Sequence, residues 1–391
     1  EAQNNEATID NIDGNVTIIG DNGSADITNA GSGTVDVSGE NKTVTVDNTN
    51  GTVTISGDSG SANITNNGGM VKVSGNNKTV TANSTGGTLN IDGNYGSAEV
   101  IGEGAGNINV SGTSKNVKIT SADANVKVTG SSGTAAVIST GAGNIEISGD
   151  GKTVTVDNAE GSVTVSGDSG SAKITNSGLG DVIINGYNKV VKIIQNGLGD
   201  VIGSQDYNSY ASTTYEQARI NITNNNNATV YGVKSKNENV YNAYYYNPYS
   251  YSSSSVGTGN ISIINKALGN AYGLYGTNVY NLTDNHKSSV LEMTNTGNGL
   301  AVGLYGTGTI ENSGTIKMHN LGEGTVVGIY ADGGTATNSG NITINRESYT
   351  DDNLTENTAD DIIYSAKTEK GGKAIGIYGT KNSNITNSGT I

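Results

Sequence analysis

Apolar and polar residues alternate in short runs along the first half of the chain, and each run ends at a glycine. The motif reads V-x-V-x-G, with pairs such as Val35 and Val37 before the glycine. A period of two residues is typical of a β-strand with one buried face, and the glycine marks a turn. These glycines recur at a nearly constant interval, at Gly20, Gly39, Gly57, Gly75, Gly93, Gly112, Gly130, Gly149, Gly167 and Gly186.

A second apolar alternation follows each turn, and its residues differ in size from one repeat to the next. One position alternates Ala and Val, as in Ala25, Val44 and Ala62, and the position two residues earlier alternates Gly and Lys. Such strands bury their apolar face by stacking on the next repeat, ~4.8 Å away. We interpret the Ala/Val alternation as interlocking layers and the Gly/Lys alternation as a separation of like charges to ~9.6 Å. Duplication of a two-coil unit would give the same pattern.

The repeat divides the chain into four parts. Residues 1–12 are a candidate N-terminal cap, and residues 13–200 are expected to form a regular β-solenoid with coils of about 18–19 residues. Residues 201–259 interrupt the pattern, and residues 260–391 carry a second solenoid section with coils of about 25 residues and insertions. The chain stops at Ile391 in the middle of a recurring motif, so we expect this section to be truncated at its C-terminus. The predicted fold is all-β.

The second section repeats the motif A/V-x-G-L/I-Y. Its tyrosines, Tyr275, Tyr305, Tyr330 and Tyr378, recur once in each coil, which predicts a stacked aromatic column with a structural role. Turns throughout the chain are rich in Asn and Gly, as in Asn66-Asn67-Gly68. Stacked Asn side chains are expected to form hydrogen-bonded ladders along the solenoid axis.

The interrupted stretch is rich in tyrosine and contains the only proline, Pro248. Tyrosine offers rigid, amphipathic contact area, and loops on a rigid scaffold are where recognition usually occurs. The stretch is either a surface insertion that folds back on the solenoid or a protruding arm that contacts a partner. The candidate partner contacts are Tyr207, Tyr210, Tyr215, Tyr241, Tyr244, Tyr245, Tyr246, Tyr249 and Tyr251.

The amino-acid composition argues against several classes of function. The chain has 36 acidic and 21 basic residues and a net charge of −15, which argues against nucleic acid as a partner. It has no Cys, which excludes disulfides, thiolate metal sites and thiol nucleophiles. No run approaches the ~20 apolar residues of a membrane-spanning helix, so we expect no direct membrane insertion of this segment.

Several phrases of the second half resemble a known family. Residues 301–306 (AVGLYG), 337–342 (TNSGNI) and 385–391 (ITNSGTI) resemble passenger domains of type V secreted autotransporters from Gram-negative bacteria. The coils of the first half are similar to filamentous-haemagglutinin-like repeats. The resemblance extends over nearly the whole chain, and it is a resemblance in the style of the repeats. It implies a right-handed parallel β-helix that is exported to the bacterial cell surface, commonly for adhesion or autoaggregation.

Catalytic and metal-binding patterns are weak. The pairs Asp351-Asp352 and Asp360-Asp361 lie in a polar insertion with no His close by in sequence, and His286 and His319 lie far apart with no partner motif. Metal-chelating histidines have short spacings. The calcium-binding nonapeptide G-G-x-G-x-D-x-U-x does not occur, and the Thr-x-Thr pairs of ice-binding solenoids are interrupted here by charged residues. We therefore expect no enzyme activity, no cofactor and no metal.

Three functions stay open from the sequence. The leading expectation is an extracellular adhesin that binds a host or bacterial cell-surface protein or glycan. The alternative is a self-assembling structural fibre or surface layer, since a solenoid end exposes backbone donors and acceptors unless it is capped. The third is a polysaccharide-active β-helix enzyme.

Overall fold

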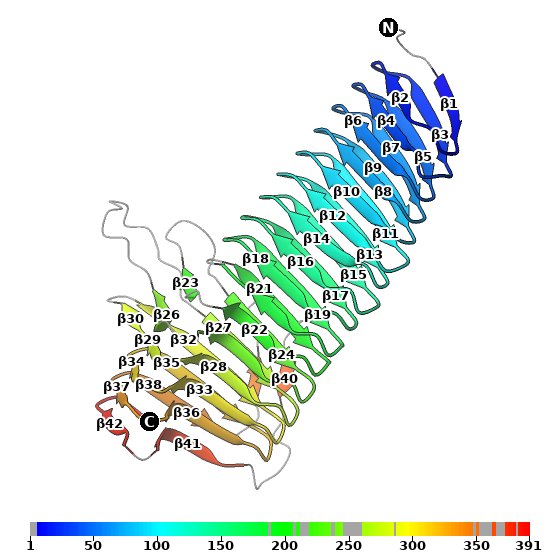
Figure 1. The fold of residues 1–391 in the computed structure, drawn as a ribbon. Helices are drawn as coiled ribbons and strands as arrows, with labels where there is room; N and C mark the ends of the chain where they lie inside the picture. The colour runs from blue at the N-terminus through cyan, green and yellow to red at the C-terminus, as the bar shows by residue number, and fades with distance from the viewer. Residues whose placement is uncertain are drawn as a thin grey trace, which may run out of the picture. The chain divides into compact units, whose positions relative to one another are not determined.

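The computed structural model describes residues 6–186, 189–205, 209–211, 219–235, 239–244, 260–284, 287–346, 349–351, 362–364, 372–380 and 382–391. These residues form strands and turns, and no helix occurs among them (Figure 1). The strands pair in long parallel sheets with regular spacing, so the predicted right-handed parallel β-helix is confirmed. The chain divides into two compact units, residues 1–180 and residues 181–391.

Unit 1 consists of two parallel sheets, and successive strands of the chain belong to them in turn. Sheet A contains β1 (Glu6–Asn11), β3 (Ser24–Asn29), β5 (Thr43–Asn48), β7 (Ser61–Asn66), β9 (Thr79–Ser84), β11 (Ser97–Gly102), β13 (Asn116–Ser121), β15 (Thr134–Ser139), β17 (Thr153–Asn158) and β19 (Ser171–Asn176). Sheet B contains β2 (Val16–Ile19), β4 (Thr34–Ser38), β6 (Thr52–Ser56), β8 (Met70–Ser74), β10 (Thr88–Asp92), β12 (Asn107–Ser111), β14 (Asn125–Thr129), β16 (Ile145–Ser148) and β18 (Val163–Ser166). Ser24 pairs with Thr43 and Thr43 with Ser61, so the register advances from coil to coil by the interval that the glycine spacing predicts.

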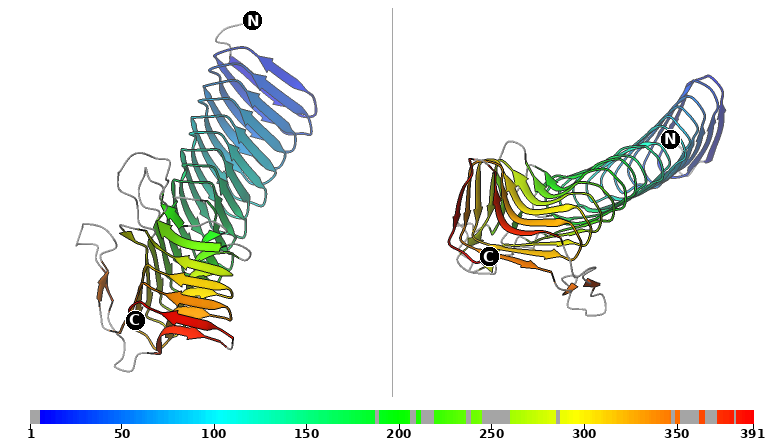
Figure 2. Two further views of the ribbon diagram at one scale, coloured as in Figure 1. Left: turned by 90° about the vertical axis from the view of Figure 1, so that its left-hand side faces the viewer. Right: turned by 90° about the horizontal axis from the view of Figure 1, so that it is seen from below.

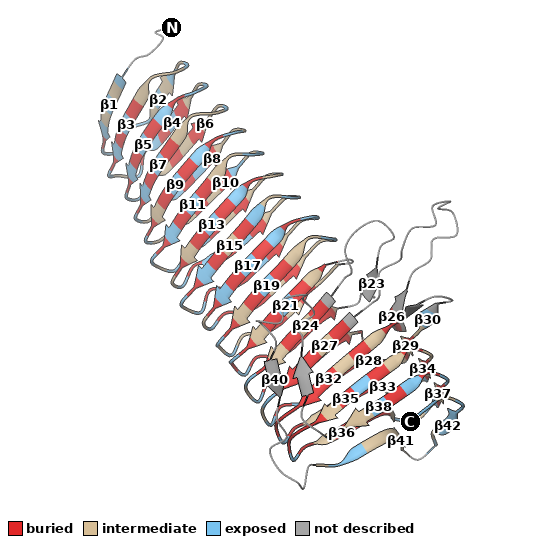
Figure 3. Ribbon diagram, turned by 180° about the vertical axis from the view of Figure 1, so that it is seen from behind, coloured by how far each residue is buried: buried red, intermediate tan, exposed pale blue. Residues whose placement is uncertain are grey.

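The core of unit 1 lies between the two sheets. Buried and exposed residues alternate along each strand (Figure 3). Ala25 pairs with Val44 and Val44 with Ala62, and all three are buried. The predicted alternation of small and large residues is therefore present in the packed core.

Unit 2 has three faces, because its coils are longer. Sheet A′ contains β21 (Val190–Gln195), β24 (Arg219–Asn224), β27 (Asn260–Asn265), β32 (Val290–Asn295), β35 (Thr315–Asn320) and β38 (Asn341–Asn345). Sheet B′ contains β20 (Val182–Ile184), β22 (Val201–Gln205), β25 (Val230–Lys234), β28 (Ala271–Gly276), β33 (Leu300–Gly306), β36 (Thr325–Ala331) and β41 (Ala374–Gly379). Sheet C′ contains β23 (Ser209–Ala211), β26 (Asn239–Tyr244), β29 (Asn278–Asn281), β34 (Thr309–Asn312), β37 (Thr335–Asn338) and β42 (Asn384–Asn387). The three faces are visible in the end-on view of this unit (Figure 2).

Two antiparallel hairpins extend the coils of unit 2. The first pairs β30 (Thr283–Asp284) with β31 (Lys287–Ser288), between sheets C′ and A′. The second pairs β39 (Tyr349–Asp351) with β40 (Ile362–Tyr364) and follows β38 of sheet A′. Both hairpins lie in coils that are longer than the basic coil of about 25 residues in the second section.

The described part of residues 201–259 includes strands of the solenoid, whereas the sequence suggested an irregular insertion for the whole stretch. Strands β22, β24 and β25 lie in this stretch and pair in register with their neighbours in sheets A′ and B′. Residues 6–11 likewise form β1, which pairs with β3, so part of the candidate N-terminal cap is a strand of the solenoid. Within residues 201–259 the strands still follow the order of the solenoid sheets. Extra residues between the strands make the sequence interval from coil to coil uneven.

The predicted asparagine ladders are present inside both units. In unit 1, Asn29 Nδ2 donates to Asn48 Oδ1 at 2.8 Å, and Asn48 Nδ2 donates to Asn66 Oδ1 at 2.9 Å. These side chains are fully buried, and each also reaches a backbone carbonyl of its own turn. In unit 2 a second ladder links Asn242, Asn281, Asn312, Asn338 and Asn387 along sheet C′.

The lysines that alternate with glycine point into the core of unit 1. Lys78 is 1% exposed, and its Nζ donates to the carbonyl oxygen of Ser59 at 2.8 Å. The intervening Gly60 has a φ of 73°, and a Cβ there would lie 2.3 Å from the carbonyl oxygen of Lys42. Charge separation therefore gives only part of the reason for the alternation, because the backbone of the turn also requires glycine.

Candidate functional site: the tyrosine column of sheet B′

The predicted tyrosine column forms on the outer side of sheet B′. The register pairs Tyr275 with Tyr305, Tyr305 with Tyr330, and Tyr330 with Tyr378. The rings of Tyr275 and Tyr305 are stacked, with centroids 4.6 Å apart and planes inclined by 4°. The next pairs along the column are tilted, with centroid distances of 5.3 Å and 4.9 Å. One tyrosine in each coil at a fixed register thus gives a continuous column of rings.

A second row of tyrosines joins the column at its N-terminal end. Tyr231 and Tyr272 are stacked at a centroid distance of 5.3 Å, with planes inclined by 13°. The Tyr272 ring meets the Tyr275 ring edge-on at 5.3 Å, although the two residues are three apart in one strand. Residues three apart on a regular strand point to opposite faces, so this contact needs a change in the backbone.

Glycine within the A-Y-G-L-Y motif accounts for that change. The ladder between β28 and β33 pairs Tyr272 with Val302 and Leu274 with Leu304, and it passes over the glycine between them. A Cβ on Gly273 would lie 2.6 Å from Leu291 of sheet A′. The strand therefore bends at a position where only glycine fits, and the bend places both Tyr272 and Tyr275 on the outer face.

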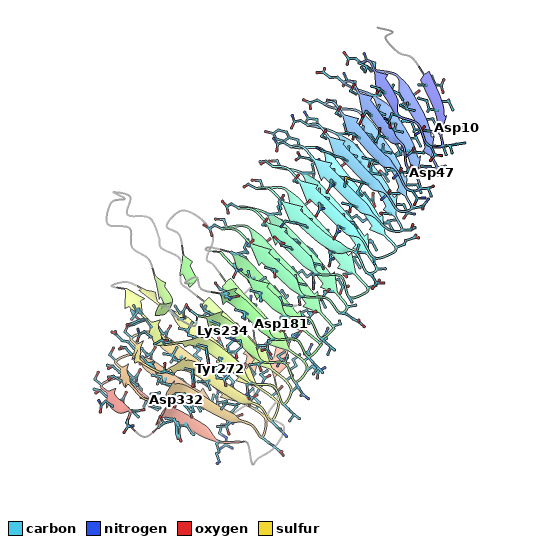
Figure 4. The ribbon with its side chains drawn as sticks, viewed as in Figure 1. Asp10, Asp47, Asp181, Lys234, Tyr272 and Asp332 are labelled. Atoms are coloured by element: carbon cyan, nitrogen blue, oxygen red, sulfur yellow. The ribbon has the colours of Figure 1, made fainter. Side chains whose placement is uncertain are left out.

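Charged groups lie at two places along the column. Lys234 Nζ lies 3.9 Å from the centroid of the Tyr231 ring, within the range of a cation–π interaction. Further along, the Tyr305 hydroxyl donates a hydrogen bond of 2.8 Å to Asp332 Oδ2 in the next coil. Lys234, Tyr272 and Asp332 are labelled along this side of the sheet in Figure 4.

Burial and neighbouring groups keep these phenols protonated. Burial, together with the Asp200 carboxylate, raises the pKa of Tyr231 to about 12. Burial also raises the pKa of Tyr305, and the hydrogen bond to Asp332 adds to this effect. The pKa values of Tyr272 and Tyr330 are raised by burial as well. At neutral pH the column therefore presents hydroxyl groups and ring edges, since neighbouring rings cover much of the ring faces.

The tyrosines named from the sequence as partner contacts lie only partly within the described residues. Tyr210 belongs to β23 and Tyr241 and Tyr244 belong to β26, and both strands are in sheet C′. Tyr241 pairs in register with Tyr280 of β29. The other six, Tyr207, Tyr215, Tyr245, Tyr246, Tyr249 and Tyr251, lie outside the described residues.

The histidine and aspartate side chains considered in the sequence as catalytic or metal-binding groups contact neighbouring coils wherever the structure describes them. His319 Nε2 lies 3.0 Å from Glu292 Oε1 across strands β35 and β32. The Asp58 carboxylate accepts a hydrogen bond from the backbone N–H of Asn76 in the next coil. In the described part of the chain, no three His, Cys, Asp or Glu side chains are grouped in a way that could hold a metal ion. His286, Asp352, Asp360 and Asp361 lie outside that part.

Four residues of the column were missed in the sequence: Tyr231, Tyr272, Lys234 and Asp332. The motifs V-Y-G-V-K and A-Y-G-L-Y share the central glycine, and this shared glycine is the signal that aligns their first tyrosines. Asp332 follows the motif of its own coil by two residues, and only the stacking of the coils brings it to Tyr305.

Fold and column together define the chain as a parallel β-helix with a partly exposed aromatic column. Comparison of the chain with protein-family models, with curated proteins and with solved structures finds no match. Among the described residues there is also no helix with the length and hydropathy needed to cross a membrane.

Proposed function

We propose that this chain is a non-enzymatic attachment protein of a bacterial cell surface, in the manner of the autotransporter passengers that its repeats resemble. The observation that carries the proposal is the tyrosine column of sheet B′. It offers hydroxyl groups and aromatic edges at fixed spacing on a strand scaffold. Rigid aromatic contact area of this kind binds proteins and glycans at a low cost in conformational entropy.

The scaffold supports this proposal through its rigidity. Strands of sheet B′ are hydrogen-bonded to the next coil, and the asparagine ladders fix the interior. Tyr378 is 42% exposed, while the other rings of the column are half-buried. A partner therefore meets preorganised groups, and it does not have to order a loop.

Adhesion of beads coated with the whole chain tests the proposal. We expect binding to at least one member of a panel of host cells, bacterial cells, matrix proteins and glycans. Replacing Tyr305, Tyr330 and Tyr378 with Ser should weaken that binding. The matched control replaces Thr45, Thr81 and Thr155 on the outer face of sheet A with Ser, and it should leave binding unchanged. Equal binding by the tyrosine variant and the threonine control would show that the column does not contribute to attachment.

A second variant separates the column from the tyrosine-rich stretch. It carries Ser at Tyr207, Tyr210, Tyr215, Tyr241, Tyr244, Tyr245, Tyr246, Tyr249 and Tyr251. Loss of binding in this variant alone would assign attachment to that stretch. Electron microscopy over a range of protein concentrations tests the fibre alternative, because filaments in place of discrete particles would make assembly the function.

A further inference from the structure

The tyrosine column also contains one pair of rings whose surroundings differ from the rest. Tyr275 and Tyr305 are the most nearly parallel pair, at 4.6 Å and 4°, and they belong to adjacent coils. The chain between them runs through the whole of one coil, so a bond between the two rings would join neighbouring coils directly.

Tyr305 has a proton acceptor in place. Its hydroxyl donates to Asp332 Oδ2 at 2.8 Å, which is within the reach required for proton transfer. Loss of an electron from a phenol makes its hydroxyl strongly acidic, so a carboxylate at this distance eases the oxidation. Tyr305 is therefore the ring of the pair that we expect to be oxidised first.

The composition of the chain directs one-electron oxidation to tyrosine. The chain has no Cys and no Trp, and its three methionines are Met70, Met293 and Met318. Two of these, Met293 and Met318, are at most 1% exposed, and Met70 is 46% exposed but carries a thioether, which gives up a single electron less readily than a phenol. The partly exposed tyrosines are therefore the main electron donors that an external oxidant meets.

We infer that Tyr275 and Tyr305 form a site of oxidative cross-linking, at which a peroxide-dependent one-electron oxidant joins the two rings as dityrosine. This inference does not rest on the attachment function. The product is a covalent link between adjacent coils of unit 2, and closing such a loop restricts the unfolded chain.

The chemistry balances with hydrogen peroxide as the final electron acceptor. Each phenol gives up one electron and its hydroxyl proton, and Asp332 takes the proton of Tyr305 before passing it to solvent. The two phenoxyl radicals then form a carbon–carbon bond between one ortho position of each ring. Each of those carbons releases its hydrogen as a proton, which restores the two hydroxyl groups. One hydrogen peroxide takes up two electrons and two protons in total and becomes two waters.

Peptide mapping of the whole chain tests the inference. The protein is treated with hydrogen peroxide and a haem peroxidase, and then digested with trypsin. Cleavage after Lys266, Lys287 and Lys317 puts Tyr275 in residues 267–287 and Tyr305 in residues 288–317. We expect these two peptides to be linked, with a mass lower than their sum by two hydrogen atoms and with dityrosine fluorescence.

Three variants locate the site. Tyr275→Phe should abolish the link, while Tyr272→Phe, in the same peptide, should leave it. Asp332→Asn should slow its formation, because an amide accepts the hydrogen bond but does not take the proton. Circular dichroism before oxidation shows that each variant has kept the strand content of the parent chain.

Mixing isotopically light and heavy chains separates links within one molecule from links between molecules. A link that carries both labels would overturn the inference. So would a link that survives in Tyr275→Phe, an equal rate in Asp332→Asn, or a dominant link through residues 237–266 or 318–346 in place of the expected pair.

Discussion

Lys115 provides the sharpest test of the way in which the core of unit 1 tolerates charge. Its side chain is 1% exposed, and its Nζ has no hydrogen-bond partner among the described residues. Lys78 is equally buried, but its Nζ is bonded to the carbonyl oxygen of Ser59. The two lysines occupy the same turn position two coils apart, so they form a matched pair.

We predict that the same replacement, lysine to methionine, lowers stability at Lys78 but not at Lys115. Methionine keeps most of the length and volume of lysine. At Lys115 it removes a buried, unsatisfied donor, which should leave the free energy of unfolding unchanged or raise it by about 1–3 kcal/mol. At Lys78 it removes a charged, partly buried hydrogen bond to the carbonyl oxygen of Ser59, which should lower the free energy of unfolding by about 1.5–3 kcal/mol.

The pH dependence adds a second measure. Burial lowers the pKa of Lys115 below 10.5, and the Asp92 carboxylate offsets this effect only in part. Between the lowered value and 10.5 the unfolded chain binds more protons than the folded chain, so stability rises as the pH rises through this window. The Lys115→Met variant should lose this contribution, and the slope of stability with pH should become smaller.

Urea unfolding of the whole chain, together with hydrogen exchange of the turn amides, checks both predictions. Hydrogen exchange reports the local change even if the units unfold separately. A loss of stability in Lys115→Met equal to that in Lys78→Met would refute the reasoning, because the hydrogen bond would then not be what distinguishes the two lysines.

Three further predictions concern the interior, one turn and the aromatic column. Asn48→Ala should cost about 1–3 kcal/mol in urea unfolding by leaving buried ladder groups unpaired, while Asn63→Ala on the exposed face should change stability by less than ~0.5 kcal/mol. Gly60→Ala should destabilise by about 1–3 kcal/mol because of its positive φ, whereas Gly86→Ala, whose Cβ would meet only ordinary van der Waals contacts, should be tolerated in the same assay. Tyr231 should titrate at about pH 12 by phenolate absorbance, and its raised pKa means that stability falls as the pH rises above 10. A Tyr231 that titrates near 10 would contradict its burial.

The regular half of the fold can be predicted from sequence because one physical signal repeats without change. Val35 and Val37 alternate with polar residues, and each is buried in the structure as the period of two requires. The inward Ala and Val column follows for the same reason. A coil of constant length keeps every inward residue at a constant spacing, so the pattern is readable without an alignment.

The third face and the coils within residues 201–259 could not be predicted in this way. Ile220 and Ile222 of β24 alternate like any inward pair. Ile220 pairs with Val191, however, so the coil between them is much longer than the coils of unit 1, which breaks a search for constant spacing. The sequence also did not show which face of the sheet Tyr272 lies on, for another reason. A bend at Gly273 reverses the alternation of the strand, and only backbone geometry reveals the bend.

Buried polar columns also determine how the coils are aligned with one another. A strand that alternates Val and Thr buries a similar apolar area after a slip of two residues, so apolar burial alone leaves the register weakly specified. A slip in β5 would take Asn48 away from both Asn29 and Asn66 and would break both of its buried amide–amide hydrogen bonds. The ladder therefore penalises the wrong register more than it stabilises the right one.

The asparagine ladder is interrupted in the middle of unit 1, and other contacts between coils continue there. The inward position changes to Ser84, Gly102, Ser121 and Ser139. Across this interval, Asn76 and Asn94 accept hydrogen bonds from backbone N–H groups of the following coils, at 3.0 Å and 2.8 Å. Ion pairs of 2.7 Å and 2.9 Å join Lys118 to Glu99 and Lys127 to Glu146 on the outer faces, although exposed pairs of this kind contribute little stability. The bonds to Asn76 and Asn94 cover the first part of this interval, and in its later part Asp123 and Asn125 accept hydrogen bonds from the backbone N–H groups of Ala142 and Asn144. We therefore conclude that polar contacts in the turns also specify the register of unit 1 where the asparagine ladder is absent.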